Sequence, residues 1–426
     1  MRILVISRNA WDDTNAIGNT ISNFFKDIDD IEFASIYFRS ASPNNTLCNH
    51  YYRTSEAEVL KKWFAKEKIG KEFFTQNDGV KNISKDNAGK KEKTLIRVIQ
   101  KHGLKLVYKL SDSLWYSEKW MNENLRKFVE SFAPDVVFSF VKSAPQYFLT
   151  VKYLRENFDI PLLSWIADDE YTGLKKKNAT REIENLRYIL GQSSQVLGCS
   201  EEICDYYNSV FGCNAKVLYK GCDLSTPIRK SENSGIKIVY AGNLLYGRLE
   251  ILKKVADELE KYSQNCSDIS FDIYSNTTLL QSEIQSTFSG LKCTKYLGRK
   301  DYETIKTELE TADIVLHVES FDEAEMLKTK YSFSTKIIDC LQSGSVMLSI
   351  GPKTLSSIEY VRKIDGACVI DDLDNLEKEL TALLDDKDNY YNRAQKIRNF
   401  ALIHHDCVNN SKEVQKMLHK ITEEET

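Results

Sequence analysis

The sequence lacks the residue patterns that mark metal and redox proteins. Its 10 cysteines form no CxxC pair, and its 6 histidines show no HExxH spacing. Scattered cysteines of this kind do not fit a zinc frame, and they are typical of reduced thiols in a cytoplasmic protein. We therefore expect a cytoplasmic protein without a metal centre.

The sequence also lacks long apolar runs and an excess of positive charge. No apolar run approaches the roughly 20 residues that a membrane-spanning helix needs. The start, MRILVISRNAWDD, has too short an apolar stretch for a signal peptide. The net charge of −4 gives no basic field for nucleic acid, which we do not expect as a partner.

Short apolar strands alternate with helical patterns twice along the 426 residues. The first series begins with ILVIS (3–7), and the second begins with IKIVYAGN (236–243). This order predicts an α/β fold with two Rossmann-like, doubly wound domains. The predicted division is a first domain over 1–228 with a lysine-rich helical insertion at about 52–125, a second domain over 229–395, and a C-terminal helix over 396–426 that could cross back.

The segment YSFSTKIIDCLQSGSVMLSIGP (331–352) predicts a helix over 334–343 that stops at Gly344 and leads into a buried strand. A helix N-terminus presents free backbone N–H groups and partial positive charge, so it can bind an anion. Ser334 and Thr335 could add hydroxyl donors, and Lys336 adds a full charge. The alternative is that Ser334 is an ordinary N-cap.

A glycine loop follows the first strand of the second domain, in YAGNLLYGRLEIL (240–252). Gly242 and Gly247 allow close backbone approach, and Arg248 at the next helix opening could clamp a phosphate. The alternative is an arginine that faces solvent. The loop is neither GxGxxG nor a Walker loop, and we expect no cofactor.

Two polar segments could contribute further binding groups. In VLHVESFDEAEMLKTKYSFSTK, acidic residues precede basic ones such as Lys330, a mixture that suits a sugar-phosphate pocket but also a solvated loop. In WIADDEYTG, Asp168 and Asp169 follow a strand and could act as a base or bind hydroxyls. Their alternative role is to cap the loop.

In their order along the chain, these motifs resemble the GT-B glycosyltransferases, most closely glycosyltransferase family 4 and related enzymes of surface-polysaccharide synthesis. ILVIS…IGNTISNFF resembles the family's first strand and glycine loop, LYKGCD its NGxD turn, YAGNLLYGR its GRL…K motif, and YSFSTKIIDCLQSGSVML its Glu-x7-Glu segment. Asn243 then stands at the family's arginine and Arg248 at its lysine. By register on Gly344, Tyr331 stands at the first glutamate, which contacts the donor sugar, and Asp339 at the second, which contacts the ribose.

The resemblance implies two domains facing a cleft and a metal-independent, retaining transfer of a hexose. The donor would be a nucleotide sugar, and the acceptor a glycan or lipid-linked saccharide in bacterial surface-polysaccharide synthesis. The implied catalytic residues are Arg248 and Lys336. The implied donor-binding residues are Gly18, Gly242, Asn243, Lys330, Tyr331, Ser334, Thr335 and Asp339, and the acceptor-side residues are Asp168 and Asp169.

Two other functions stay open. A nucleotide-sugar epimerase would need proton-transfer groups, for which His317 is the suitably placed histidine, and a catalytically silent partner of another transferase is the second alternative. LIRVIQKHGLKLVYKL (95–110) interleaves apolar and basic residues, which favours either a helix packed on its own domain or peripheral contact with the inner face of an anionic membrane.

Overall fold

The structure is a computed structural model that describes residues 1–56, 58–59, 69–75, 112–118, 120–228, 235–264 and 268–424. It contains two compact units, Met1–Leu218 with Ser411–Thr426, and Tyr219–Asn410. The chain therefore passes between units after Leu218, whereas the sequence predicts a boundary after residue 228. Most of the predicted insertion, including the amphipathic segment 95–110, lies outside the described residues.

The first unit is built on an 8-stranded sheet in the order β4-β3-β2-β1-β5-β6-β7-β8. Its strands are β1 (Arg2–Ser7), β2 (Glu32–Tyr37), β3 (His50–Arg53), β4 (Lys71–Phe74), β5 (Val136–Phe140), β6 (Leu162–Ile166), β7 (Gln195–Gly198) and β8 (Lys216–Val217). All neighbouring pairs are parallel except β3 and β4. Its described helices include α1 (Ala16–Phe25), α6 (Glu123–Phe132), α7 (Pro145–Phe158), α8 (Tyr171–Lys176), α9 (Thr180–Gly191) and α10 (Glu201–Phe211).

The C-terminal helix returns to the first unit. α19 (Cys407–Glu424) begins in the second unit, and the residues from Ser411 onward belong to the first. The Ser411 hydroxyl donates a hydrogen bond to the Phe24 carbonyl at 3.4 Å. The end of the chain thus packs beside α1.

The second unit is built on a 6-stranded sheet in the order β11-β10-β9-β12-β13-β14, with all pairs parallel. Its strands are β9 (Ile236–Ala241), β10 (Ile269–Tyr274), β11 (Thr294–Gly298), β12 (Ile314–Val318), β13 (Val346–Ile350) and β14 (Cys368–Ile370). Its helices include α11 (Arg248–Ser263), α12 (Gln281–Phe288), α13 (Tyr302–Glu310), α14 (Glu323–Thr329), α15 (Thr335–Ser343), α16 (Ser356–Arg362), α17 (Leu376–Asp385) and α18 (Tyr390–His404). Two 3-10 turns, η1 (Leu373–Asn375) and η2 (Lys387–Asn389), flank α17.

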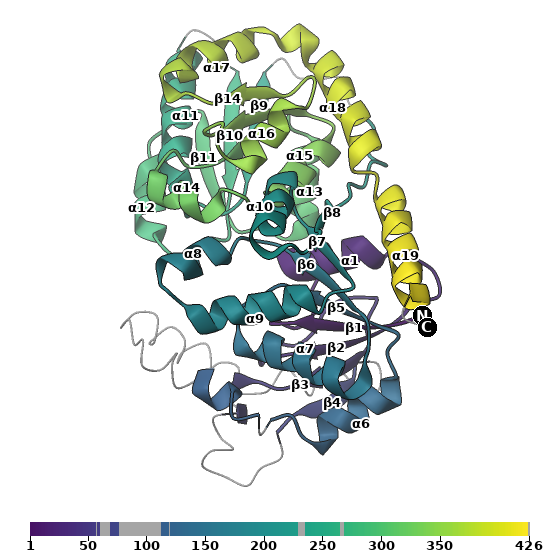
Figure 1. Cartoon of the computed structure of the whole chain (residues 1–426). Coiled ribbons are helices and arrows are strands. Elements are labelled where there is room, and N and C mark those ends of the chain that lie inside the picture. The colour runs from purple at the N-terminus through teal and green to yellow at the C-terminus, as the bar shows by residue number, and fades with distance from the viewer. Residues whose placement is uncertain are drawn as a thin grey trace. The chain divides into compact units, whose positions relative to one another are not determined.

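Helices cover both faces of the second sheet (Figure 1). One core contains Ile238 and Leu316 with side chains of α11, α12 and α17, and the other contains Val239 and Val315 with side chains of α13, α15 and α18. Successive residues of a strand point to opposite faces, so strands buried on both faces read as continuous apolar runs. The predicted fold class is confirmed for each unit.

The strand order reverses between β9 and β12, where Ile314 pairs with Ile238 and Val315 with Val239. In doubly wound sheets, ligands bind outside the carboxyl ends of the strands at such a reversal. The segments that follow Ala241 and Val318 therefore define where a ligand of this unit is expected.

Candidate functional site

The loop after β9 turns sharply before α11 begins. Tyr246 and Gly247 both adopt left-handed backbone conformations, with φ of 59° and 71°. A Cβ on Gly247 would lie 2.3 Å from the Ser320 hydroxyl, so a side chain has no room there. The Leu244 N–H donates to Thr277 Oγ1 at 2.9 Å. These contacts fix the loop and the direction in which α11 starts.

Arg248, the first residue of α11, points inward and is 5% exposed. Its Nε donates to the Val318 carbonyl at 3.0 Å, its Nη1 to Asn243 Oδ1 at 2.9 Å and its Nη2 to Glu319 Oε2 at 2.7 Å. Arg248 thus joins the two strand ends at the reversal of the sheet. Asn243 and Arg248 are therefore in direct contact. The Arg248 guanidinium, however, is bound by protein groups and does not point freely toward a phosphate.

Glu319 is 3% exposed and connects Arg248 to His317. Its Oε1 lies 3.3 Å from His317 Nε2, and His317 Nδ1 lies 2.8 Å from the Ser349 hydroxyl. Because a carboxylate only accepts hydrogen bonds, His317 donates through Nε2 and accepts through Nδ1. Burial alone would raise the pKa of Glu319, but the hydrogen bond from His317 and the charge of Arg248 hold it at about 2. Burial lowers the pKa of His317, which is therefore neutral at pH 7.

The N-terminus of α15 carries backbone N–H groups that are free to bind a ligand. Ser334 is the N-cap, its N–H donates to Ser357 Oγ at 2.9 Å, and its carbonyl accepts from the Ile337 N–H at 3.0 Å. The N–H groups of Thr335 and Lys336 have no hydrogen-bond partner in the part of the chain that the structure describes. This first turn has the geometry of an anion site.

Lys336 extends from this turn across Gly242. A Cβ on Gly242 would lie 2.1 Å from Lys336 Cε, so the glycine is what lets the lysine stem pass. Burial and the charge of Arg248 lower the pKa of Lys336 to about 8. Its ammonium has no ion pair with any described residue. The site therefore holds a half-buried cation without a direct ion pair, on which the carboxylates of Glu319 and Asp339 act through space.

Asp339 is half-buried one turn further along α15. Burial raises the pKa of Asp339, although the charges of Lys220 and Lys336 act in the opposite direction. Lys220 is fixed through its carbonyl, which lies 3.0 Å from His405 Nδ1. Asp339 thus lies within electrostatic range of two lysines and forms no ion pair with a described residue.

Lys330 and Tyr331 precede α15 and are less enclosed. The Lys330 carbonyl accepts from Ser356 Oγ at 2.9 Å, whereas its exposed ammonium lies 5.0 Å from the centre of the Tyr331 ring. The backbone at Lys330 is therefore fixed and its charge faces solvent. Tyr331 supplies a ring and a hydroxyl where the resemblance expects a carboxylate.

The motifs do not predict Glu319 as the partner of Arg248. The available signal is positional, because the carboxyl ends of adjacent parallel strands lie at one edge of a sheet. A charged residue directly after β12 could therefore be expected beside one that follows β9.

In the first unit, Gly18 lies in the first turn of α1 after β1. Its N–H donates to the Asn15 side chain at 3.0 Å, and a Cβ at this position would lie 2.2 Å from the Asp12 carbonyl oxygen. Gly18 is thus needed for the packing of this turn against the loop after β1.

Asp168 and Asp169 follow β6 and have different surroundings. Asp168 is exposed, with Oδ2 at 3.7 Å from Lys142 Nζ, and the same ammonium lies 3.1 Å from Glu170 Oε1. Asp169 Oδ1 accepts from the Thr172 N–H at 3.2 Å and so holds the first turn of α8. Asp168 is the more accessible of the two carboxylates.

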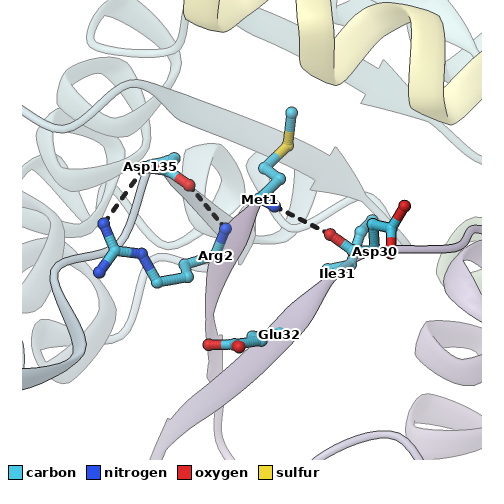
Figure 2. Close-up of a pocket in the computed structure, with 6 residues that line it drawn as sticks. All are labelled: Met1, Arg2, Asp30, Ile31, Glu32 and Asp135. Atoms are coloured by element: carbon cyan, nitrogen blue, oxygen red, sulfur yellow. Dashed lines mark hydrogen bonds and ion pairs between the residues drawn. The ribbon is translucent and has the colours of Figure 1, made fainter.

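A surface hollow lies at the amino ends of the first unit's strands, lined by Met1, Arg2, Asp30, Ile31, Glu32 and Asp135. Figure 2 shows Met1 paired with Asp30 and Arg2 paired with Asp135. The Met1 ammonium donates to the Asp30 carbonyl at 2.8 Å, and the Arg2 N–H donates to Asp135 Oδ2 at 2.7 Å. This edge is opposite to the one where doubly wound sheets bind ligands, and we assign it no function.

Within the described residues, no group of three or more His, Cys, Asp or Glu side chains could hold a metal ion. In the same part of the chain, no helix is long and apolar enough to cross a membrane.

Solved structures with the same fold cover nearly the whole chain. The Anabaena protein HepE in complex with UDP is 11% identical, with a TM-score of 0.64 over 99% of this chain and 100% of its own. Sucrose-phosphate synthase from Thermosynechococcus elongatus is 9% identical, with a TM-score of 0.65 over 99% and 98%. UDP-GlcNAc 2-epimerase from Neisseria meningitidis bound to UDP-GlcNAc is 14% identical, with a TM-score of 0.50 over 99% and 100%. The sequence matches no protein-family model and no curated protein. The likeness shows the GT-B fold of two Rossmann-like units.

Proposed function

We propose that the chain transfers a hexose from a nucleotide sugar to a hydroxyl of a glycan or lipid-linked saccharide. The observation that carries this proposal is the unpaired, half-buried ammonium of Lys336 beside two free N–H groups at the start of α15. A diphosphate would pair directly with this ammonium and with these N–H groups. The start of α15 lies at the edge of the sheet where doubly wound folds bind ligands.

The proposed roles follow from the geometry. Lys336 and the amides of Thr335 and Lys336 hold the diphosphate and stabilise the negative charge that develops on the leaving nucleoside diphosphate. The Arg248 guanidinium is hydrogen-bonded to Glu319, Asn243 and Val318. It is therefore proposed to act on the diphosphate through space and not by direct contact. Asp339 accepts hydrogen bonds from the ribose hydroxyls.

The remaining roles rest on the resemblance. Asp168 is proposed to bind an acceptor hydroxyl, while Asp169 shapes its loop. Gly18 and Lys330 are proposed donor contacts, and the transfer is proposed to retain the anomeric configuration and to need no metal. A place in bacterial surface-polysaccharide synthesis, in the cytoplasm at the inner face of the membrane, completes the proposal.

The epimerase alternative has weaker support from the residues. His317 is 0% exposed, and both of its ring nitrogens are engaged, by Glu319 and Ser349. The histidine that the sequence offers for proton transfer is therefore closed off from a substrate.

The test incubates the full chain with UDP-glucose, UDP-GlcNAc and GDP-mannose and follows the products by chromatography. Slow release of nucleoside diphosphate with free sugar, or transfer to an added saccharide, supports a transferase. Conversion to an isomeric nucleotide sugar identifies an epimerase. If the chain neither binds nor converts any of these donors, the transferase and the epimerase are both refuted. The function that then stays open is that of a catalytically silent partner of another transferase.

A further inference from the structure

Lys336 has the properties of a nucleophile that a small molecule can reach. Its Nζ forms no ion pair or hydrogen bond with a described residue. The side chain is only half-buried, and the unpaired polar atoms of the described residues that lack solvent contact all belong to other side chains. At pH 7, a pKa of about 8 leaves roughly a tenth of the amine unprotonated, whereas an ordinary lysine of pKa about 10.4 is unprotonated to roughly 0.04%.

The stem of Lys336 is held in one direction by the loop after β9. A Cβ on Gly242 would lie 2.1 Å from Lys336 Cε and 2.9 Å from its Cδ, so the end of the stem lies against the Gly242 backbone. Lys336 is also the second residue of α15, where its own N–H and that of Thr335 have no partner among the described residues. A fixed amine and a turn that can bind a phosphate therefore belong to the same part of the second unit.

This arrangement matches the chemistry of an acyl phosphate, the mixed anhydride of a carboxylic acid and phosphoric acid. Its phosphate carries the same kind of charged oxygens as the diphosphate of the proposed function, and its carbonyl carbon is an electrophile one oxygen atom away. A phosphate held at the start of α15 would place that carbon near the Lys336 amine and make the attack effectively intramolecular. We propose, resting on the anion site of the proposed function, that acyl phosphates acylate Lys336 and so block this site.

The reaction needs no other reagent. Unprotonated Nζ attacks the carbonyl carbon and forms a C–N bond, the bond between that carbon and the bridging oxygen breaks, and inorganic phosphate leaves with the electron pair. The nitrogen then loses one proton to water. The product is an amide without charge, so it no longer forms an ion pair with a phosphate.

The first test treats the full chain with acetyl phosphate and follows each lysine by peptide mass spectrometry. We expect Lys336 to be acetylated at least about tenfold faster than Lys378, an exposed lysine on α17, because far more of its amine is unprotonated. Inorganic diphosphate should slow the reaction at Lys336 and leave Lys378 unaffected. A rate at Lys336 no greater than that at Lys378 overturns the inference, and so does the absence of protection by diphosphate.

The second test separates guidance by the phosphate site from simple amine reactivity. Thr335→Pro removes one free N–H at the first helical position, which tolerates proline, and Ser334 before it has a ψ of 116°, close to the extended conformation that precedes a proline. Thr335→Ala, which keeps the N–H, is the matched control. With acetyl phosphate, Lys336 should react roughly fivefold more slowly in Thr335→Pro than in Thr335→Ala. With p-nitrophenyl acetate, which carries no phosphate, the two variants should react equally fast.

Equal rates of the two variants with acetyl phosphate overturn the inference, and protection of the wild type by diphosphate decides the matter if Thr335→Pro fails to fold. The block itself is measured by titration calorimetry with inorganic diphosphate, which the chain acetylated at Lys336 should bind at least about tenfold more weakly than the untreated chain. Unchanged affinity overturns the block. Selective, diphosphate-protected acetylation of a chain that binds neither UDP, GDP nor a nucleotide sugar refutes the proposed function and supports the acylation of Lys336.

Discussion

Replacing Lys336 by methionine should stabilise the protein and impair ligand binding at once. Methionine keeps an apolar stem across Gly242 but removes the charge. The pKa of Lys336 falls to about 8 in the folded protein, whereas a free lysine has a pKa of about 10.4. The unfolded chain therefore holds this proton more strongly, and protonated Lys336 opposes folding at pH 7.

The size of the effect follows from the same numbers. Each pKa unit corresponds to about 1.4 kcal/mol, so the variant should gain about 3 kcal/mol in free energy of unfolding at pH 7. For a unit of this size that is roughly 5–10 °C in melting temperature. The wild type should itself become more stable as the pH rises from about 8 to about 10.4, so the gain should shrink over that range.

Binding should change in the opposite direction. Loss of a charged hydrogen bond costs about 1.5–3 kcal/mol, or roughly 10- to 150-fold in the Kd for a nucleoside diphosphate. Since the protonated lysine binds, wild-type affinity should fall about tenfold between pH 7 and pH 9, and the affinity of Lys336→Met should stay flat.

Scanning calorimetry and titration calorimetry over this pH range measure both effects. Lys378→Met, an exposed lysine on α17, is the matched control. The reasoning is refuted if Lys336→Met is no more stable than the wild type at pH 7 and binds the nucleoside diphosphate equally well.

Three further changes test other parts of the site and of the chain. Arg248→Met should lower the free energy of unfolding by about 3–5 kcal/mol in urea denaturation, because the buried Glu319 loses its cationic partner. The double variant Arg248→Met/Glu319→Gln should recover much of this loss. A double variant that is no more stable than Arg248→Met would contradict the ion pair. Asp339→Asn should weaken a nucleoside diphosphate by roughly fivefold but not inorganic diphosphate, and equal effects on both would remove the ribose contact. If the segment 95–110 binds membranes, the chain should float with anionic vesicles at low salt, and glutamine at all four basic positions should abolish flotation; these positions are Arg97, Lys101, Lys105 and Lys109.

The strands and the α15 helix could be predicted because their signals are local. The helix expected over 334–343 is observed as Thr335–Ser343, with Ser334 as N-cap and Gly344 in a left-handed C-cap at φ 77°. The continuous apolar runs ILVIS (3–7) and IKIVYAGN (236–243) correspond to β1 and β9, the first strands of the two sheets. β3 and β4 were not predicted, since they are 4 residues each and carry mixed polar and aromatic side chains.

The direction of Arg248 could not be predicted in the same way. Its position at a helix opening is a local property, but its orientation depends on Glu319, which is 71 residues away in sequence. Helix and strand periodicity carries no information about such a partner. The same holds for Lys336, whose path across Gly242 depends on two segments that meet only in the folded sheet.

The two cations of the site therefore differ in what they can do. Arg248 is saturated by internal acceptors, so its charge is fixed in place and acts on a ligand through space. A buried ion pair such as Arg248–Glu319 contributes little net stability compared with apolar side chains of similar volume. What this pair supplies is position, because it ties the loop after β9 to the end of β12. Lys336 has no direct ion pair, and burial together with the charge of Arg248 lowers its pKa to about 8. A diphosphate bound beside its ammonium would favour the protonated form and offset the cost of burying it, so ligand binding and the stability of this unit should rise together.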